Sequence, residues 1–153
     1  MVSPVRNHPA RMPVPTHPAR LMTQPRWRLA CALWVLVILW ATTIYSNVFV
    51  GHSHWNLVQW VPSPGTGTWL EFATDVLANI GLFAPLGFTL GPAGLFPTRR
   101  RLVLATAVSL ALSMSVELVQ VYSHNRLGAT SDLMANTLGG LVGAYLQMKR
   151  RWG

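Results

Sequence analysis

The sequence predicts an all-α membrane protein with four transmembrane helices, and three observations support this prediction. Only 10% of its 153 residues are charged and 51% are hydrophobic, whereas soluble domains carry about a quarter charged residues. The apolar residues form long runs. The net charge of +8 comes from basic residues clustered beside those runs. This pattern is typical of a protein that lies in a lipid bilayer, and it argues against a nucleic-acid partner.

The first segment, residues 1–26, differs from the rest of the chain. It is rich in Pro and Arg and contains the tetrapeptide His-Pro-Ala-Arg twice. Because it has few residues that could form a core, we expect a disordered cytoplasmic segment. No small-residue cleavage site follows the next apolar run, so we expect no cleaved signal peptide. The start of the chain is open between Met1, Met12 and Met22.

The first predicted transmembrane helix covers residues 27–50. Within it, Leu29 to Val50 contains 22 residues, none of them charged. As a helix this run would span about 33 Å, enough to cross a hydrocarbon core of about 30 Å. Residues 51–74, which follow it, are predicted to form an extracytoplasmic loop.

Residues 75–148 hold the other three predicted helices. The second run, 76–96, ends before three consecutive Arg, and the third, 102–122, contains the single charge of Glu117. The fourth run, 133–148, is the shortest. A helix of that length only just crosses a bilayer, so the sequence leaves open whether it spans fully.

Basic residues predict the orientation. They precede the first run, separate the second from the third, and form a tail at residues 149–153. The loop 51–74 contains none, and the connection after the third run contains only Arg126. Since cytoplasmic loops are enriched in Lys and Arg, a multi-pass protein with both termini in the cytoplasm is predicted.

All four carboxylates fall on the predicted outer side: Glu71, Asp75, Glu117 and Asp132. A charge within a membrane helix costs about 2.5–3.5 kcal/mol, so such a residue is expected to be functional or paired. Arg126 is the one cation predicted on that side. Glu117 or Asp132 is its natural partner.

A short pattern occurs twice. Residues 74–79 read TDVLAN and residues 131–136 read SDLMAN, 57 positions later. Each copy puts Asp and Asn four residues apart, on one helix face, and offers Thr74 or Ser131 as an N-cap. The repeat suggests two related helical hairpins in parallel orientation. The alternative is two similarly capped helices without such a relation. The Asp and Asn positions are Asp75, Asn79, Asp132 and Asn136.

The third helix adds a polar face. Glu117, Gln120 and His124 are spaced i, i+3 and i+7, and Ser113 lies one turn earlier. One interpretation is a binding site formed with the repeated Asp and Asn residues. The alternative is a network of hydrogen bonds and an ion pair that holds the helices together.

Small residues predict where helices approach closely. Gly87 and Gly91 are four residues apart, as are Gly139 and Gly143. Spacing of this kind forms a flat face against which a second helix can pack.

The sequence contains no Gly-x-Ser-x-Gly elbow, phosphate-binding loop, HExxH or CxxC motif, and therefore no hydrolase mechanism can be assigned. His52 and His54 supply only two metal ligands, and Cys31 is the single cysteine. We therefore predict no metal and no cofactor. Whether the protein is an enzyme is left open.

Taken together, these motifs resemble a known family. Asp75-x-x-x-Asn79 precedes Gly-Leu-Phe-Ala-Pro-Leu-Gly, and Glu-x-x-Gln, Arg and Asp-x-x-x-Asn follow in order. This order resembles the VanZ-like family, which contains the teicoplanin resistance protein of that name, over roughly residues 70–146. The matching positions are Asp75, Asn79, Phe83, Pro85, Gly87, Glu117, Gln120, Arg126, Asp132 and Asn136.

The resemblance implies a small integral protein of the bacterial inner membrane, and it supplies no catalytic roles. With the outward carboxylates, it leads us to expect a pocket that binds or modifies a lipid-linked or peptidoglycan-related headgroup. Arg126 would contact a phosphate or carboxylate, and Glu117 would orient Arg126 or act as a base. The two Asp residues, aided by the two Asn amides, would hold a cation or amine. The ligand-binding candidates are Asp75, Asn79, Glu117, Gln120, Arg126, Asp132 and Asn136.

Two other classes of function are compatible with the sequence. In the first, the same residues form an interhelical network in a structural or accessory protein, which forms a homo-oligomer or docks on an envelope enzyme. The second is a small transporter. It is disfavoured because no carboxylate lies near the middle of a span, where coupling sites usually lie.

Overall fold

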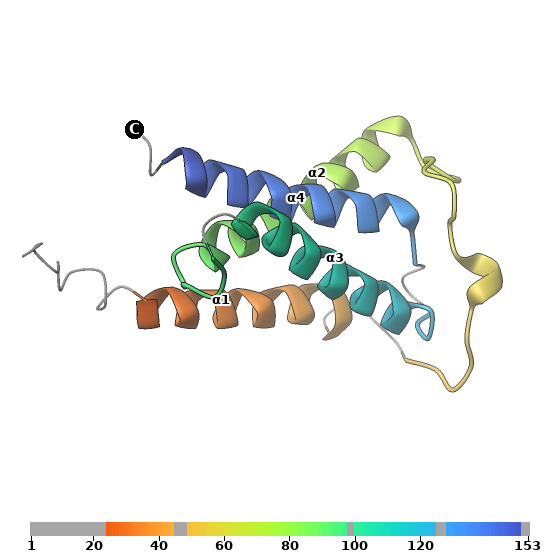
Figure 1. Cartoon of the computed structure of the whole chain (residues 1–153). Helices are drawn as coiled ribbons and strands as arrows, with labels where there is room; N and C mark the ends of the chain where they lie inside the picture. The colour runs from red at the N-terminus through yellow and green to blue at the C-terminus, as the bar shows by residue number, and fades with distance from the viewer. Residues whose placement is uncertain (1–23, 45–48, 98–99, 125–127, 151–153) are drawn as a thin grey trace, which may run out of the picture.

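The computed structural model describes residues 24–44, 49–97, 100–124 and 128–150. These parts contain four long helices and, besides two isolated β-bridges, no β-structure, so the all-α prediction is confirmed (Figure 1). The elements are α1 (Gln24–Leu39), the π-helical turn η2 (Trp40–Ile44), the short 3-10 helix η3 (Trp55–Leu57), α2 (Trp69–Leu90), α3 (Arg101–Gln120) and α4 (Thr130–Lys149).

Three of the helices are long and apolar enough to cross a membrane: residues 25–44, α2 and α3. The fourth, α4, has 20 residues and would span about 30 Å. Its Gly, Ser, Thr and Asn residues make it less apolar than the other three. Four helices are thus confirmed, and membrane crossing by α4 remains a prediction.

The first helix differs from its prediction at both ends. It begins at Gln24, so residues 24–26 are helical rather than disordered, and Pro25 suits its first turn. The rest of the predicted disordered segment lies outside the described residues. The α-helix ends at Leu39 and continues as the π-helical turn η2 to Ile44, the last residue described before position 49. Phe49 forms a bridge to Ser123 and is not helical as predicted.

The start of α2 lies seven residues before the predicted one, because Thr68 and Glu71 form a capping box. The Thr68 hydroxyl accepts a hydrogen bond from the Glu71 N–H (3.2 Å), and the Glu71 carboxylate accepts one from the Thr68 N–H (2.7 Å). Thr74 is therefore inside the helix, where its hydroxyl donates to the Leu70 carbonyl. The prediction of Thr74 as N-cap is wrong.

The start of α4 is also earlier than predicted. Its N-cap is Ala129, which has no capping side chain, and Ser131 lies within the first turn. The prediction of Ser131 as N-cap is therefore wrong. Asp132 does lie in the first turn, where the helix dipole favours a negative charge.

The helices α2 and α4 form the centre of the bundle. Both run from the end that carries the 49–68 connection toward the opposite end, with α1 packed on α2 and α3 on α4 (Figure 1). A Cβ atom on Gly143 would overlap the Ala84 carbonyl, and one on Gly87 would overlap the Gly140 carbonyl. The predicted close approach at these glycines is therefore confirmed.

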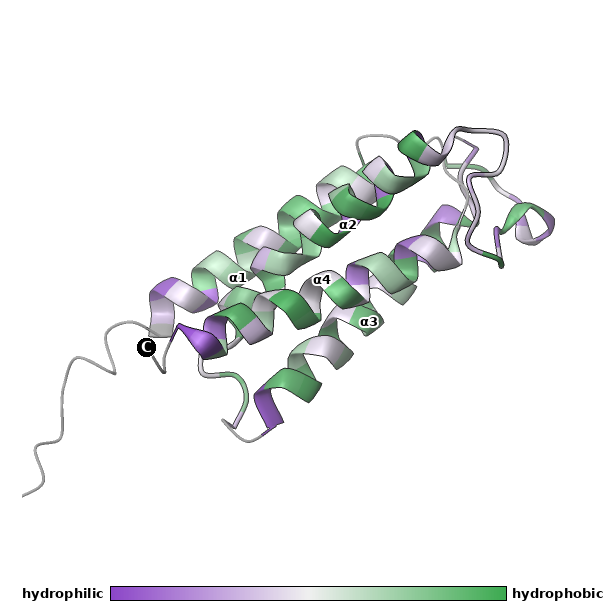
Figure 2. Ribbon diagram, turned by 90° about the horizontal axis from the view of Figure 1, so that it is seen from above, coloured by the Kyte–Doolittle hydropathy of each residue, from purple (hydrophilic) through white to green (hydrophobic). Residues whose placement is uncertain are grey.

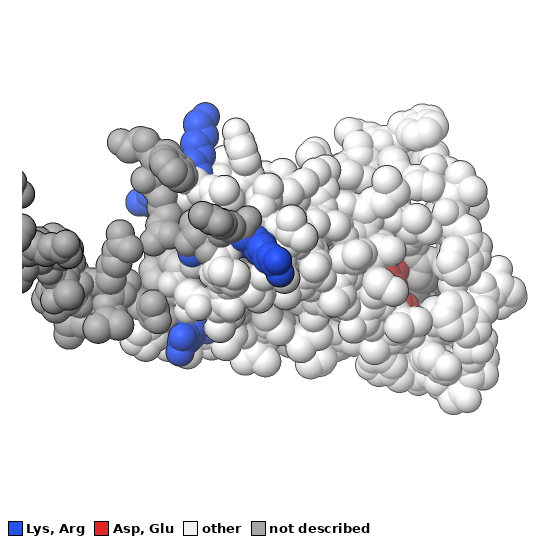
Figure 3. Space-filling model, in the orientation of Figure 1, with Lys and Arg blue, Asp and Glu red and all other residues white. Residues whose placement is uncertain are grey.

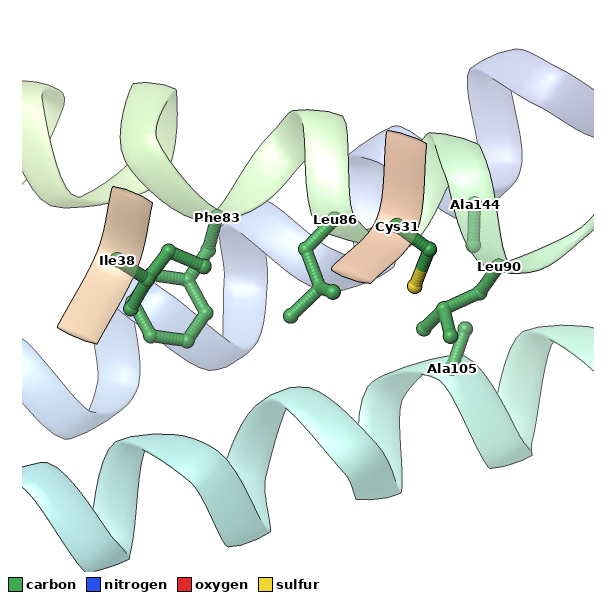
Figure 4. Close-up of a cluster of buried hydrophobic side chains, with 7 residues drawn as sticks. All are labelled: Cys31, Ile38, Phe83, Leu86, Leu90, Ala105 and Ala144. Carbon is green, nitrogen blue, oxygen red and sulfur yellow. The ribbon is translucent and has the colours of Figure 1, made fainter. Parts of the chain in front are cut away.

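Side chains from all four helices meet beside this contact (Figure 4). The helix α2 contributes the largest share of the buried apolar cluster. Its members are Cys31, Ile38, Phe83, Leu86, Leu90, Ala105 and Ala144.

Large apolar side chains also cover the outside of the bundle, including Leu33, Leu77, Leu110 and Met134. Figure 2 shows hydrophobic residues along the helices and more hydrophilic residues toward their ends. An exposed apolar surface around every helix is typical of a protein whose surroundings are lipid.

We predict that Gly143→Ala lowers the stability of the protein by about 1–3 kcal/mol, because its methyl group would push α2 away from α4. Gly81→Ala is the matched control, since nothing lies within 4 Å of a Cβ atom there. It should leave stability unchanged or raise it by about 0.5–1 kcal/mol. Thermal unfolding in detergent measures both, and equal stabilities would contradict the packing described here.

Candidate functional site

Charged side chains separate to opposite ends of the bundle. In Figure 3, Lys and Arg lie toward one end and carboxylates are seen toward the other. The basic residues among those described lie at the start of α1 and α3 and at the end of α4. They are Arg26, Arg28, Arg100, Arg101, Lys149 and Arg150. Basic and acidic side chains thus lie at opposite ends of the bundle, and the assignment of the carboxylate end to the extracytoplasmic side remains a prediction.

A cavity of about 760 Å³ lies at the carboxylate end. Its wall comes from the first turns of α2 and α4 and from the connection between residues 59 and 67. Three of the four carboxyl groups line it: Glu71, Asp75 and Asp132. Gln59, Ser63, Thr74 and Ser131 add amide and hydroxyl groups. Apolar side chains such as Leu70, Phe72 and Val76 complete the wall, so the cavity is an acidic recess of mixed polarity at the end of an apolar bundle.

The parallel packing of α2 and α4 brings the two repeated Asp residues to this cavity. The contacts that join Ile80 to Gly139 and Ala84 to Gly143 pair positions 59 apart. Asp75 and Asp132 are 57 apart, so this register puts both at the same level of the bundle. Asp75 is exposed and Asp132 is half-buried.

The two Asn residues of the repeat do not line the cavity. Asn79 and Asn136 are both buried, one helical turn deeper than the Asp residues. The Asn136 amide donates to the Ser113 hydroxyl at 2.9 Å and so joins α4 to α3. The two Asn side chains therefore lie apart from the cavity that the two Asp residues line.

Two further candidates join segments of the fold. The Gln120 amide donates to the Thr42 carbonyl at 3.1 Å, which ties α3 to η2. The Glu117 carboxylate accepts from the Ala129 N–H at 2.7 Å, at the start of α4. Glu117 also lines a second, mostly apolar pocket of about 220 Å³.

His124 does not complete the predicted face of α3. This helix ends at Gln120, so His124 lies beyond it and does not share a helical face with Glu117. The prediction for His124 is wrong in this respect. Arg126 lies outside the described residues.

The sequence reasoning did not include Glu71 or Gln59 among the candidates. A signal for Glu71 was present, because Thr68-x-x-Glu71 is the pattern of a capping box. For Gln59 no signal was available. Its backbone forms hydrogen bonds with Gly128 (2.9 Å) and Thr130 (3.0 Å), and these are contacts of tertiary structure.

Comparison with models of protein families shows to which family this chain is related. The sequence model of the VanZ/LLP1 family matches residues 27–150. The chain belongs to the VanZ/LLP1 family. The match confirms the resemblance and extends it to α1, beyond the motifs in residues 70–146. No curated protein and no solved structure matches the chain.

This VanZ/LLP1 chain has the helices and the exposed apolar surface of a membrane protein. Five of the polar motif residues that the structure describes fall into two groups. Asp75 and Asp132 line the cavity, whereas Glu117, Gln120 and Asn136 form hydrogen bonds between segments.

We predict that Ser113→Ala destabilises the protein by about 1 kcal/mol, since it leaves the buried Asn136 amide without its partner. Ser115→Ala is the control. Ser115 is exposed, and its hydroxyl bonds only to the Ala111 carbonyl of its own helix. Thermal unfolding in detergent compares the two variants. A control as unstable as Ser113→Ala would refute the role of this bond.

Proposed function

We propose that this protein binds a cell-envelope component at the acidic cavity, in the form of a lipid-linked or peptidoglycan-related headgroup that carries an amine. The observation that supports this proposal most strongly is the convergence of Glu71, Asp75 and Asp132 on one cavity at the end of an apolar bundle. In the predicted topology, this end faces the extracytoplasmic side.

Electrostatics favours an amine over an anion. A carboxylate and an ammonium group 4 Å apart attract each other by about 4 kcal/mol near a protein surface. Three carboxyl groups around one recess reinforce this preference. The hydroxyl and amide groups of Ser63, Ser131 and Gln59 can hydrogen-bond to the polar groups that surround an amine in a headgroup.

The proposed role is binding of the ligand, and the cavity could also support a chemical modification of it. The cavity walls include carboxyl groups, which can transfer protons, but no His or Cys. A modification of the ligand would therefore depend on Asp75, Asp132 or Glu71 as acid or base. Arg126 would contact a phosphate or carboxylate of the same ligand. We further propose that such binding contributes to teicoplanin resistance, as the family resemblance suggests.

A second candidate is a structural or accessory role. It is supported by the hydrogen bonds of Glu117, Gln120 and Asn136, which all join different segments. Such a protein would form a homo-oligomer or dock on an envelope enzyme. A transporter is less well supported, because each carboxylate lies in an end region of its helix.

We predict that Asp75→Asn weakens binding to liposomes that contain a lipid-linked peptidoglycan precursor by about tenfold. Loss of one charge opposite an amine removes at least about 1 kcal/mol. Teicoplanin resistance conferred on a sensitive Gram-positive host should fall in parallel, with vancomycin tested beside it and membrane levels matched. Asp75 is exposed, and the variant should therefore remain folded.

Glu117→Gln is the matched control. It also removes one carboxylate, but outside the cavity, and its amide oxygen can still accept from the Ala129 N–H. If the acidic cavity alone holds the ligand, this variant should bind and protect like the wild type, whereas a Glu117 that orients Arg126 predicts a loss of binding. Equal binding by all three proteins would refute the cavity as the binding site. Unfolding of Glu117→Gln would instead support the interhelical network, to which Glu117 contributes its bond to the Ala129 N–H.

A further inference from the structure

Three histidines from two separate connections meet at the carboxylate end of the bundle. His52 and His54 belong to the connection between α1 and α2, and His124 follows α3. The ring centroids are 4.8 Å apart for His52 and His54, 4.9 Å for His54 and His124, and 5.6 Å for His52 and His124. One ring nitrogen of each residue lies within 4.8 Å of those of the other two.

Backbone hydrogen bonds hold this arrangement. The Val50 N–H donates to the Tyr122 carbonyl at 3.0 Å, and the His54 N–H donates to the Val121 carbonyl at 2.8 Å. Phe49 and Ser123 form an antiparallel bridge. These contacts lie on either side of His52 and directly before His124. The backbone of the two connections therefore places the three rings close together.

The ring of His54 is also oriented. Its Nδ1 lies 3.2 Å from the Val121 carbonyl oxygen. Because a carbonyl oxygen can only accept, Nδ1 must carry the proton and donate it. In the neutral imidazole, the Nε2 atom then keeps its lone pair. A metal-binding histidine usually has this feature, in which the second ring nitrogen donates to a carbonyl and thereby selects the tautomer.

We propose that His52, His54 and His124 bind one divalent transition-metal ion of the class that imidazole prefers, with Zn²⁺ as the representative. Tetrahedral Zn²⁺ with Zn–N bonds of about 2.0–2.1 Å needs nitrogens about 3.3 Å apart. His52 and His124 are exposed and His54 is half-buried. Rotation of the two exposed side chains can therefore close the remaining gap.

Three protein ligands leave a fourth position for water or for an anionic group of a ligand. The ion would also join the connection before α2 to the end of α3, and so clamp two loops that the helices alone do not join. This site is separate from the acidic cavity, because none of the three histidines lines it. The proposal therefore stands independently of the proposed function.

The test is Zn²⁺ binding by the full chain, purified in detergent without a His tag and stripped of metal by a chelator. Competition with a chromogenic zinc indicator measures affinity and stoichiometry. We expect one Zn²⁺ per chain and an increase in the thermal unfolding temperature upon binding. His124→Ala should weaken binding by about tenfold or more, because even groups that only orient a ligand contribute about 10–100-fold.

His8 and His17 provide the control, since they are the only other histidines in the chain. The double variant His8→Ala/His17→Ala should bind Zn²⁺ like the wild type. Circular dichroism confirms that each variant remains helical, and His52→Ala provides a second test should His124→Ala fail to fold. Unchanged affinity in both His52→Ala and His124→Ala, or loss of binding in the control, would overturn the proposal.

Discussion

The close parallel contact between α2 and α4 is the interaction on which the rest of the structure depends. Gly87, Gly139 and Gly143 allow the two backbones to approach so closely that a methyl group would overlap a carbonyl of the other helix. In lipid, helices associate through such packing rather than through the hydrophobic effect. The contact sets the register of the two repeated Asp residues and leaves the outer faces of α2 and α4 for α1 and α3.

Hydrogen bonds between polar side chains and other segments then stabilise the helix packing that the glycines allow. A buried N–H group in an apolar bundle is costly without an acceptor, and the side-chain NH2 groups of Asn136 and Gln120 find acceptors on other segments. Glu117 holds the start of α4 in the same way. Only near the helix ends, beyond the packed core, do carboxylates face a cavity. The family motif therefore combines residues that join segments of the bundle with residues that line a cavity.

The sequence predictions were most accurate for features that depend on residues close together in the chain. The apolar runs and the glycine faces were correctly interpreted, because membrane-spanning length and close packing each leave a regular pattern along the chain. Helix ends were less accurate. The repeated Thr and Ser were taken as caps, but Thr68 starts α2 through a bond to Glu71, and Ala129 precedes α4 without a capping side chain.

The sequence by itself determined the helical membrane class, the family and the presence of polar residues near the helix ends, since length, hydropathy and motif order are properties of neighbouring residues. Only the tertiary structure decided the role of each polar residue. Asp75 and Asn79 share a helix face, yet one lines the cavity and the other is buried, because only the deeper turn lies within the packed core. His124 meets His52 and His54 through backbone pairing between residues about 70 positions apart, and a pattern along one helix cannot reveal such a contact.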